Sequence, residues 1–553
     1  MNKKAGTEEL KKFIPFVILG IITIILVVRN RYTFCWSDES FYASNLYRIS
    51  KGDKFFLDEW HYTVLSAYVV YPFYALYVLL KGSTEGIYLY LRDLCVLFSL
   101  IVSLATYNCL IRKNFSKTAA LLASVGVLIY SRANISGCSY YNMGFILFLT
   151  VAIVLYMDFY SHKTLIAILA GIILTMCIVT VPYVLPVLPV IFVFSFVLKK
   201  KEYLIMSISS GISGLLFGAY LILSIGIGNI LGSKVLSTTG FNGSKLLQYF
   251  YDFGHFFAHT LIIQFFCLVI NSVNGNKWIK RFTLACSTAC LLFNLYNKRT
   301  LLGGAGISLI VFSLQLIPLV WKDMEEEKKR LIVYFAVVGL LFSYIVYMSS
   351  DTELDAATIG FTIVQISAIL IIAETLGIIG ESVLIIALMC TFFLRIFGVY
   401  RDDYLQNCTD LITRGPAKGL YTTAEHYAQY EDICADIDEY IKPLGSDTGL
   451  LVSKVAPWSY IYADTECASF TTWIVDMSDE RLEEYYKTHP FPDVVLILDP
   501  EIGGYVDTYL GSWKTGKDLY PNDNQLEGFL WRYIQDNDYE INHCRSGMIC
   551  SKQ

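Results

Sequence analysis

Long apolar runs, separated by short polar loops, fill most of the first 400 residues of the chain. A helix needs about 20 apolar residues to cross the roughly 30 Å of hydrocarbon in a bilayer. Thirteen runs approach or exceed that length, and they lie at 13–28, 87–111, 118–131, 141–160, 164–180, 182–198, 203–226, 254–272, 282–296, 302–321, 331–349, 357–376 and 380–398. The pattern predicts an α-helical polytopic membrane protein with about thirteen transmembrane helices over residues 1–399.

A fourteenth apolar run, residues 62–80, is rich in tyrosine and contains Pro72. Without it, and with the N-terminus inside, the cytoplasmic loops carry eighteen Lys and Arg residues, whereas the outer loops from residue 131 onward carry five. Counting 62–80 as a span would place the basic loops outside, against the positive-inside rule. Because tyrosine favours the headgroup level, we expect helices at 62–80 and 38–50 to lie in the outer interface, within an outer segment at 29–86.

The first run, 13–28, leads into Arg29-Asn30-Arg31-Tyr32, with no small-residue cleavage site after it. We interpret it as a retained first span and not as a cleaved signal peptide.

The pattern changes after about residue 400. Residues 427–441 have helical spacing, and residues 449–455 and 494–498 are short apolar runs that favour strands. Strands that alternate with helices are typical of a small α/β domain. The sequence predicts such a soluble domain over residues 400–553, and the charge count places it on the extracytoplasmic side.

The composition agrees with a membrane protein, since 55% of the residues are hydrophobic and 16% are charged, against about 45–50% and about 25% in soluble domains. The net charge of -5 and the lack of a basic domain argue against a nucleic-acid partner. Fourteen cysteines form no Cys-x-x-Cys pair, and a disulfide between Cys544 and Cys550 stays open. So few candidate disulfides favour a bacterial plasma membrane over an oxidising lumen.

Four carboxylates and a histidine gather in the first outer loop: Asp38, Glu39, Asp58, Glu59 and His61. A carboxylate that is partly removed from water can act as a general base, and a pair of carboxylates can hold a divalent cation. Acidic residues in an outer loop are also often simply solvated. The residue types do not decide among these interpretations, so it also stays open whether the carboxylates bind a metal ion.

The order of these residues resembles the GT-C membrane glycosyltransferases, in particular the protein O-mannosyltransferases and the lipid A aminoarabinose transferase. Asp38-Glu39 follows a first span, His61 opens an interfacial helix, and Arg92 lies near the start of the second span. The family's His-Pro-Pro motif is incomplete, because Tyr62-Thr63 follows His61. The resemblance covers the overall layout, including thirteen spans and an outer C-terminal domain, but its motif is confined to about residues 36–92.

The resemblance implies a glycosyltransferase, of hexosyl or pentosyl type, whose donor is a sugar on a polyprenyl phosphate. The acceptor hydroxyl of a glycan, wall polymer, lipid or protein would attack with inversion. Asp38 matches the family's catalytic base, and Glu39 would support it or orient the acceptor. The remaining expected pocket residues are Tyr42, Asp58, Glu59 and His61. No cofactor is required, although a divalent cation fits.

A phosphate leaving group needs cations to stabilise it. The candidates on the predicted outer side are Arg92, Arg132, Lys298, Arg299 and Arg401. An ionisable group at membrane depth is a functional candidate, but long basic side chains also reach to the interface without any such role. Arg92 and Asp93 are adjacent and form a neutral pair in the alternative interpretation.

Two other classes of protein stay open. A transporter or flippase of lipid-linked sugars would place ionisable groups or broken helices at mid-membrane. These spans are expected to be nearly free of buried charge, and the main exception, Glu374, lies near an inner end. A non-catalytic envelope assembly protein would not need the Asp38 cluster. The aromatic segments 457–460 and 471–473 are expected to belong to the core of the C-terminal domain, with stacking on sugar rings as the alternative.

Overall fold

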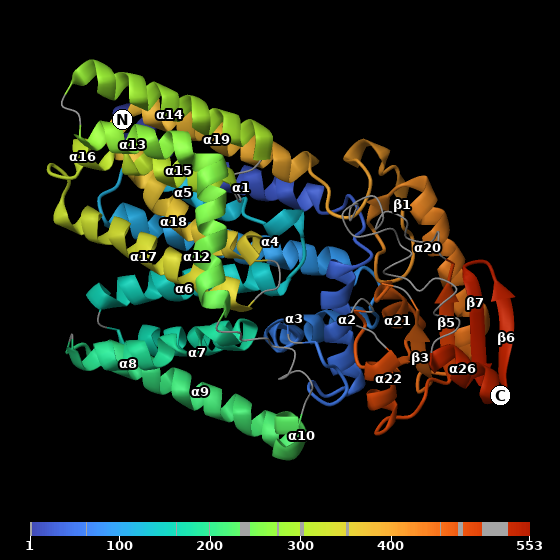
Figure 1. The fold of residues 1–553 in the computed structure, drawn as a ribbon. Coiled ribbons are helices and arrows are strands. Elements are labelled where there is room, and N and C mark those ends of the chain that lie inside the picture. The colour runs from blue at the N-terminus through green and yellow to red at the C-terminus, as the bar shows by residue number, and fades with distance from the viewer. Residues whose placement is uncertain are drawn as a thin grey trace.

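The computed structural model describes residues 3–61, 63–161, 163–197, 199–232, 244–273, 276–298, 304–349, 353–453, 455–473, 479–499 and 529–552. A bundle of long helices forms one part of the molecule, and a smaller part with a β-sheet lies at one end of the bundle (Figure 1). The two chain ends lie at opposite ends of the molecule (Figure 1).

The first part of the chain, up to residue 397, is helical, and its α-helices range from four to 27 residues. They are α1 (Lys3–Arg29), α2 (Asp38–Lys51), α3 (Ser66–Lys81), α4 (Ile87–Arg112), α5 (Lys117–Leu128), α6 (Tyr140–Ser161), α7 (Thr164–Thr180), α8 (Val187–Val197), α9 (Lys201–Ile225), α10 (Ile227–Gly232), α12 (Ser244–Phe256), α13 (Ile262–Val273), α14 (Lys277–Lys298), α15 (Gly304–Leu314), α16 (Ile317–Val320), α17 (Glu326–Ser349), α18 (Glu353–Leu376) and α19 (Ile378–Phe397).

Six helical segments among the described residues are long and apolar enough to cross a membrane. They belong to α4, α6, α9, α17, α18 and α19. Five further apolar helical segments are shorter, of 10–17 residues, and include Phe13–Arg29 of α1 and Thr164–Thr180 of α7. The helical, membrane-type character of residues 1–399 is confirmed, while the number of thirteen spans stays a prediction.

Three of the predicted runs are interrupted helices. The run 182–198 begins as a short 3-10 turn at Pro182–Val184 before α8 starts, because proline cannot donate the backbone hydrogen bond of a helix interior. The run 254–272 contains a single π turn, Phe257–Leu261, between α12 and α13. The run at 302–321 is divided between α15 and α16, with Pro318 in the first turn of α16.

The predicted outer helices at 38–50 and 62–80 are present as α2 and α3. Helix α2 runs across the end of the bundle, between the bundle and the sheet (Figure 1). The charged side chains stabilise the helix dipole, because the acidic Asp38 and Glu39 lie in the first turn and the basic Arg48 and Lys51 lie in the last. Gly52 follows with a left-handed backbone, φ 98°, which ends the helix.

Helices α17 and α18 pack with almost no space between their backbones. A Cβ added to Gly339 would lie 2.7 Å from the backbone nitrogen of Val364. A Cβ on Gly360 would overlap the backbone of Ser343. Close approach through small residues is a usual way for membrane helices to associate, and here it fixes α18 at the centre of the bundle.

A buried chain of uncharged polar side chains joins α13, α14 and α15. Gln264 donates to the carbonyl of Ser287 at 3.1 Å, and Ser308 donates to the Gln264 side chain at 2.6 Å. Gln315 donates to the Ser287 hydroxyl at 2.8 Å. Hydrogen bonds of this kind hold membrane helices together, so these residues are best explained as helix–helix contacts.

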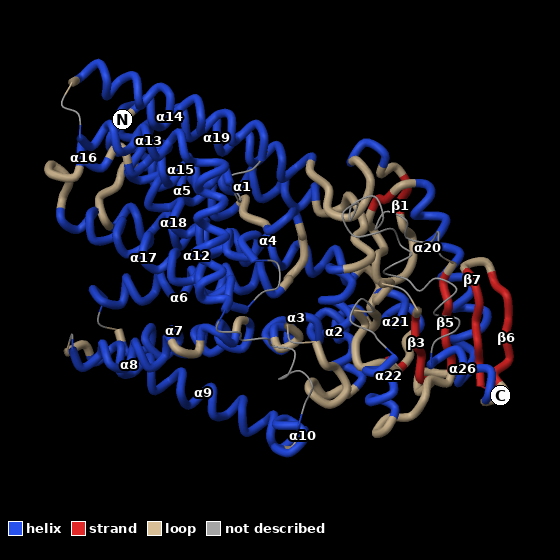
Figure 2. Tube along the Cα trace, in the orientation of Figure 1, coloured by secondary structure: helices blue, strands red, loops and turns tan. Residues whose placement is uncertain are grey.

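The C-terminal part contains two sheets (Figure 2). Strands β1 (Asp410–Leu411) and β2 (Tyr421–Thr422) form an antiparallel pair. The larger sheet has the order β4-β3-β5-β7-β6 and contains β3 (Gly449–Val452), β4 (Glu466–Cys467), β5 (Val494–Leu498), β6 (Tyr539–Cys544) and β7 (Gly547–Lys552). Strands β4, β3 and β5 are parallel, and β5, β7 and β6 are antiparallel.

Four helices among the described residues accompany the larger sheet, namely α20 (Ala424–Asp436), α21 (Trp458–Ala463), α22 (Asp479–Tyr486) and α26 (Phe529–Asp536). The expected helix at 427–441 and the strands at 449–455 and 494–498 are therefore present, and a small sheet with helices agrees with the predicted α/β pattern, while the domain boundary stays a prediction. The hairpin of β6 and β7 was not predicted.

All fourteen cysteines, each of which the structure describes, are free thiols. Cys544 pairs with Gly547 across the hairpin, whereas Cys550 pairs with Ile541. The two cysteines are thus offset by three residues along the ladder, about 10 Å at the usual rise of a strand. A disulfide between Cys544 and Cys550 does not form with this register.

Candidate active site

Asp38 is the first residue of α2, and its carboxylate lies beside the segment that joins α19 to the sheet domain. Arg401 Nη1 lies 2.7 Å from Asp38 Oδ2, and the Tyr400 hydroxyl donates to the same oxygen at 2.9 Å. The Ser37 hydroxyl donates to it at 3.2 Å and also accepts from Arg401 Nη1 at 2.7 Å. The Asp38 side chain keeps 20% of its surface exposed, so it is held in place but still accessible.

Glu39, the next residue, points into the bundle and binds Arg92 of α4. Arg92 Nε and Nη2 each lie 2.5 Å from one oxygen of the Glu39 carboxylate, and both side chains are buried. Arg92 Nη1 donates to the backbone carbonyl of Asn30 at 2.6 Å. Asp93 accepts from the Asn30 side chain at 2.9 Å and is not the partner of Arg92. Arg92, an expected phosphate ligand, thus directs four of its N–H groups to Glu39 and backbone oxygens.

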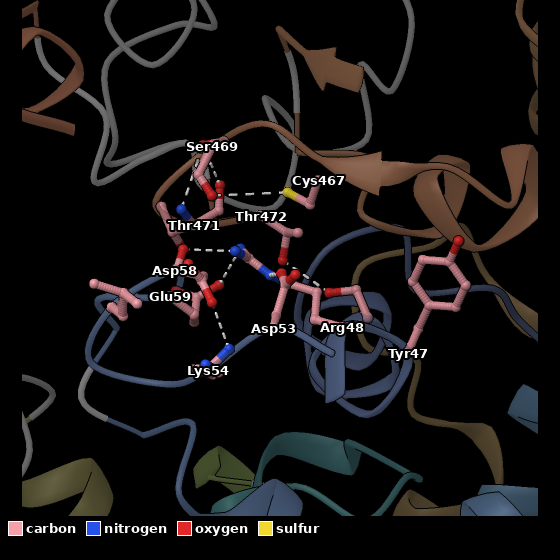
Figure 3. Close-up of polar contacts among 12 residues, drawn as sticks. Tyr47, Arg48, Asp53, Lys54, Asp58, Glu59, Cys467, Ser469, Thr471 and Thr472 are labelled. Carbon is pink, nitrogen blue, oxygen red and sulfur yellow. Dashed lines mark hydrogen bonds and ion pairs between the residues drawn. The ribbon is translucent and has the colours of Figure 1, made fainter. Parts of the chain in front are cut away.

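The second acidic pair, Asp58 and Glu59, lies in a different environment around Arg48 of α2 (Figure 3). Arg48 Nη1 is 2.8 Å from Glu59 Oε2, and Arg48 Nε is 2.5 Å from Asp53 Oδ2. Arg48 Nη2 donates to the Asp58 carbonyl at 2.6 Å. Arg48 and Glu59 are almost wholly buried. Arg48 therefore connects the C-terminal end of α2 to the loop that follows this helix.

Burial raises the pKa of Glu59 to about 7, although the neighbouring Arg48 favours the ionised form. Glu59 Oε1 accepts from the backbone N–H of His61 at 3.0 Å. The ring of His61 packs edge-on against Phe41, with 4.8 Å between centroids. Burial, with a smaller contribution from Arg481, lowers the pKa of His61 to about 3. His61 is thus a neutral side chain of the loop core at ordinary pH.

The ring of His61 has a defined tautomer. The backbone N–H of Thr63 lies 3.3 Å from His61 Nδ1, and the Thr63 hydroxyl lies 2.9 Å from it. An amide N–H can only donate, so Nδ1 is the acceptor. We therefore assign the proton of the neutral ring to Nε2.

Asp58 connects the outer loop to the sheet domain. Its Oδ1 lies 3.1 Å from His489 Nε2, and its Oδ2 accepts from the backbone N–H of Lys54 at 2.6 Å. The His489 ring stacks on Tyr485 at 4.0 Å. Although partial burial acts in the opposite direction, the hydrogen bond from His489 lowers the pKa of Asp58.

Tyr42, four residues after Asp38 in α2, lies near both Asp38 and Arg132. Tyr42 is within electrostatic reach of Asp38, Tyr140, Tyr141 and Arg132, and burial raises its pKa well above 10. The guanidinium of Arg132 covers the Tyr141 ring at 3.7 Å from its centroid. Asp38, Tyr42, Arg132 and Arg401 are the predicted site residues that the fold brings into one neighbourhood.

Lys298 and Arg299 are the other two cations that the sequence suggested as ligands of the donor phosphate. Lys298 is the last residue of α14. Arg299 lies outside the described residues. The structure therefore adds nothing to the role of these two residues.

The sheet domain holds the loop that carries Asp38. Thr33 N–H donates to the Tyr421 carbonyl at 2.7 Å, and Phe34 N–H donates to Asp402 Oδ2 at 2.6 Å. Asp402 also lies 2.8 Å from His426 Nδ1 and is fully buried. These contacts position residues 33–38 from the side opposite to the helix bundle.

Aromatic side chains fill the space between this loop and the sheet domain. Trp36 packs edge-on against Trp458 at 5.3 Å, and Trp458 stacks on Tyr430 at 4.2 Å. All three rings are buried, so Trp458 belongs to the core, as expected. Trp473 differs, because it is half-buried and faces the Arg401 guanidinium at 5.7 Å.

The four acidic residues do not form a common cation site. Each of the four has a basic partner of its own, and the partners are Arg401, Arg92, His489 and Arg48. Among the residues that the structure describes, no group of three or more His, Cys, Asp and Glu side chains could hold a metal ion.

Several residues of the site were not predicted. Tyr400 directly precedes Arg401 after the last apolar run, and that position at the predicted outer membrane face was a usable signal. Arg48, Asp402 and His489 gave no such signal, because their partners lie in loops or in a distant part of the chain.

Neither a protein-family model nor a curated protein matches the chain. Among solved structures, the archaeal oligosaccharyltransferase AglB from Archaeoglobus fulgidus, in complex with an inhibitory peptide and a dolichol-phosphate, aligns with 98% of this chain and with 75% of its own. The two are 12% identical, with a TM-score of 0.41. Similarity of this degree carries no argument about fold or activity, so the function has to be argued from the residues of this chain.

Proposed function

We propose that this protein is a membrane glycosyltransferase that moves a hexose or pentose from a polyprenyl phosphate to an acceptor hydroxyl, with inversion at the anomeric carbon. Asp38 is the general base. The observation that carries the proposal is the position of the Asp38 carboxylate, which is accessible, anchored by Arg401 and close to Tyr42 and Arg132.

The reaction needs one base and one stabilised leaving group. The acceptor oxygen attacks the anomeric carbon, and its proton passes to Asp38. The bond between that carbon and the phosphate oxygen breaks, and its electron pair stays on the polyprenyl phosphate. Because the phosphate is already a good leaving group, the base and nearby cations suffice.

The neighbours of Asp38 have supporting roles. Glu39 is turned away and bound by Arg92, so it fixes the first turn of α2 and with it the position of Asp38. Arg132 and Arg401 are the cations near Asp38 that stabilise the phosphate. Hydrogen bonds and ion pairs with Arg48 hold the loop after α2, which contains Asp58, Glu59 and His61. In this proposal these three residues shape the acceptor pocket and do not touch the reacting atoms.

The site faces the extracytoplasmic side in this proposal. The distribution of Lys and Arg over the loops supports that orientation. A bacterial plasma membrane, with the carrier lipid in its outer leaflet and a glycan, wall polymer, lipid or protein as acceptor, agrees with it.

The test is turnover by the purified full chain. Polyprenyl-phosphate sugars carrying different radiolabelled hexoses and pentoses are supplied together with an envelope extract, and the release of polyprenyl phosphate is measured. We expect release by the wild type and a loss of at least about 100-fold in Asp38→Asn, which is the usual range for a general base. Glu85→Gln, which removes a surface carboxylate paired with Lys418, is the matched control.

If no donor is consumed but a polyprenyl-phosphate sugar crosses the bilayer in proteoliposomes, a transporter is the better interpretation. Turnover that survives Asp38→Asn would keep the enzyme and assign the base elsewhere.

A further inference from the structure

The segment between α19 and the sheet domain contributes Arg401, whose guanidinium forms an ion pair with Asp38. Arg401 lies four residues after the end of α19 and has a left-handed backbone, φ 51°. A residue with a side chain adopts this conformation at a cost in free energy and keeps it only where its surroundings hold it. Here the contacts with Asp38 and Ser37 hold it.

The ion pair of Arg401 is much looser than that of Arg92. Nη1 of Arg401 contacts one carboxylate oxygen of Asp38, whereas Arg92 binds both oxygens of Glu39 through two nitrogens. Asp38 also remains 20% exposed, in contrast to the buried Glu39. A single-armed pair that is open to solvent is weaker than a buried two-armed pair. Of these two pairs, the one at Asp38 is therefore the one that a competing anion can open.

The present contacts are also unfavourable for a base. Arg401, Tyr400 and Ser37 all contact Oδ2 of Asp38, and each of them stabilises the ionised carboxylate. These contacts occupy one oxygen of the carboxylate, Oδ2. A partner of that oxygen has to leave before the acceptor hydroxyl can approach it.

The reaction itself moves negative charge from Asp38 to the phosphate. Asp38 changes from one negative charge to none when it takes the acceptor proton. The sugar-linked phosphate is a diester with one negative charge, and the released polyprenyl phosphate is a monoester that carries more. A guanidinium that can reach both the Asp38 carboxylate and the phosphate is attracted to the phosphate as the negative charge moves there. Its planar pair of N–H groups also binds two phosphate oxygens better than it binds a single carboxylate oxygen.

Building on the proposed function, we infer that Arg401 exchanges Asp38 for the donor phosphate. When the donor binds, the guanidinium turns from Asp38 and Ser37 to the phosphate oxygens, and the Asp38 carboxylate becomes available for the acceptor proton. When polyprenyl phosphate leaves, Arg401 returns to Asp38. Trp473 and Tyr400, whose rings face the guanidinium at 5.7 and 5.3 Å, form the surface along which it turns.

Binding of decaprenyl phosphate to the full chain in detergent, followed by tryptophan fluorescence, tests the exchange without requiring turnover. We expect Asp38→Asn to bind decaprenyl phosphate several-fold more tightly than the wild type, because Arg401 no longer has to leave a carboxylate. Arg401→Gln should bind it at least tenfold more weakly and bind decaprenol, which lacks the phosphate, unchanged. Arg545→Gln, a surface arginine of the sheet domain, is the control.

A conservative variant gives an independent readout. Arg401→Lys keeps the charge but loses the planar fork, so it should bind decaprenyl phosphate more weakly than the wild type and more tightly than Arg401→Gln. Equal affinity of Asp38→Asn and the wild type for decaprenyl phosphate would overturn the exchange, as would a wild type that does not bind decaprenyl phosphate. A wild type that binds the phosphate and shows the two affinity changes, but transfers no sugar, would uphold the exchange and refute the glycosyltransferase.

Discussion

The carboxylate of Glu39 and the guanidinium of Arg92 form a buried two-armed ion pair, 2.5 Å on each arm, between residues 53 positions apart. This pair joins the first turn of α2 to α4. The first of the two acidic neighbours at the start of α2 thus remains accessible, while the second is used to fix the helix.

Removing one partner of this pair should destabilise the protein strongly. Arg92→Leu leaves a buried, unpaired carboxylate, and such a loss costs about 3–5 kcal/mol. We expect a marked drop in the thermal unfolding midpoint of the detergent-purified protein. The double variant Glu39→Gln with Arg92→Leu should recover part of that loss, and Arg112→Leu, an exposed arginine of the same helix, should leave the midpoint nearly unchanged. A double variant that is no better than Arg92→Leu would contradict the pairing.

Arg48 and Glu59 should respond very differently to substitution, although they contact each other. Arg48→Leu removes the partner of Asp53, Glu59 and the Asp58 carbonyl together, and a loss of about 3–5 kcal/mol is expected. Glu59 has a pKa of about 7, so it is partly neutral at pH 7, and Glu59→Gln should cost about 1 kcal/mol or less at pH 6. Thermal unfolding at pH 6 compares the two, and equal losses would argue against the raised pKa of Glu59.

His61 should make the folded protein sensitive to acid. Its pKa is about 3 in the folded state and about 6.5 in the unfolded chain. Between these values the unfolded chain binds the extra proton, so stability is fully present above pH 6.5 and declines as the pH falls toward 3. The decline amounts to about 2 kcal/mol at pH 5.

The measurement is the thermal midpoint at pH 7 and pH 5. We expect His61→Gln to reduce the difference between the two, whereas His543→Gln, on the exposed face of β6, should leave it as in the wild type. A wild-type slope in His61→Gln would show that other groups carry the acid sensitivity.

The contact between α17 and α18 should tolerate no side chain at Gly360. A methyl group there overlaps backbone atoms of Ser343, which can yield only if the helices separate. We expect Gly360→Ala to destabilise the protein by about 3 kcal/mol or more. On the exposed face of α9, Gly214 has no neighbour within 4 Å, so Gly214→Ala should be neutral or slightly stabilising. Similar yields and midpoints for the two alanine variants would refute the close packing.

The helices and the sheet domain could be predicted because hydrophobic length and periodicity determine them locally. The breaks at Pro182 and Pro318 had visible causes, whereas the π turn at 257–261 and the hairpin of β6 and β7 did not. For the site, the residue types were informative, since Asp38 and Glu39 do begin a helix at the end of the bundle.

The partners of these residues could not be predicted from sequence. One histidine and three arginines bind the four acids, and only Arg48 lies within about a dozen positions of its partner. Which basic side chain meets which acid depends on how α2, α4 and the sheet domain pack. That information is carried by contacts spread over the whole chain.

The hydrogen bond from the Phe34 N–H to Asp402 joins residues that are 368 positions apart. During synthesis the loop with Asp38 emerges early, but its outer wall is made of residues that emerge only after every predicted span. The site is therefore completed last. A ribosome-bound or truncated chain that stops near residue 399 would contain Asp38 without Arg401, so the protein is expected to stay inactive until the final quarter of the chain has folded.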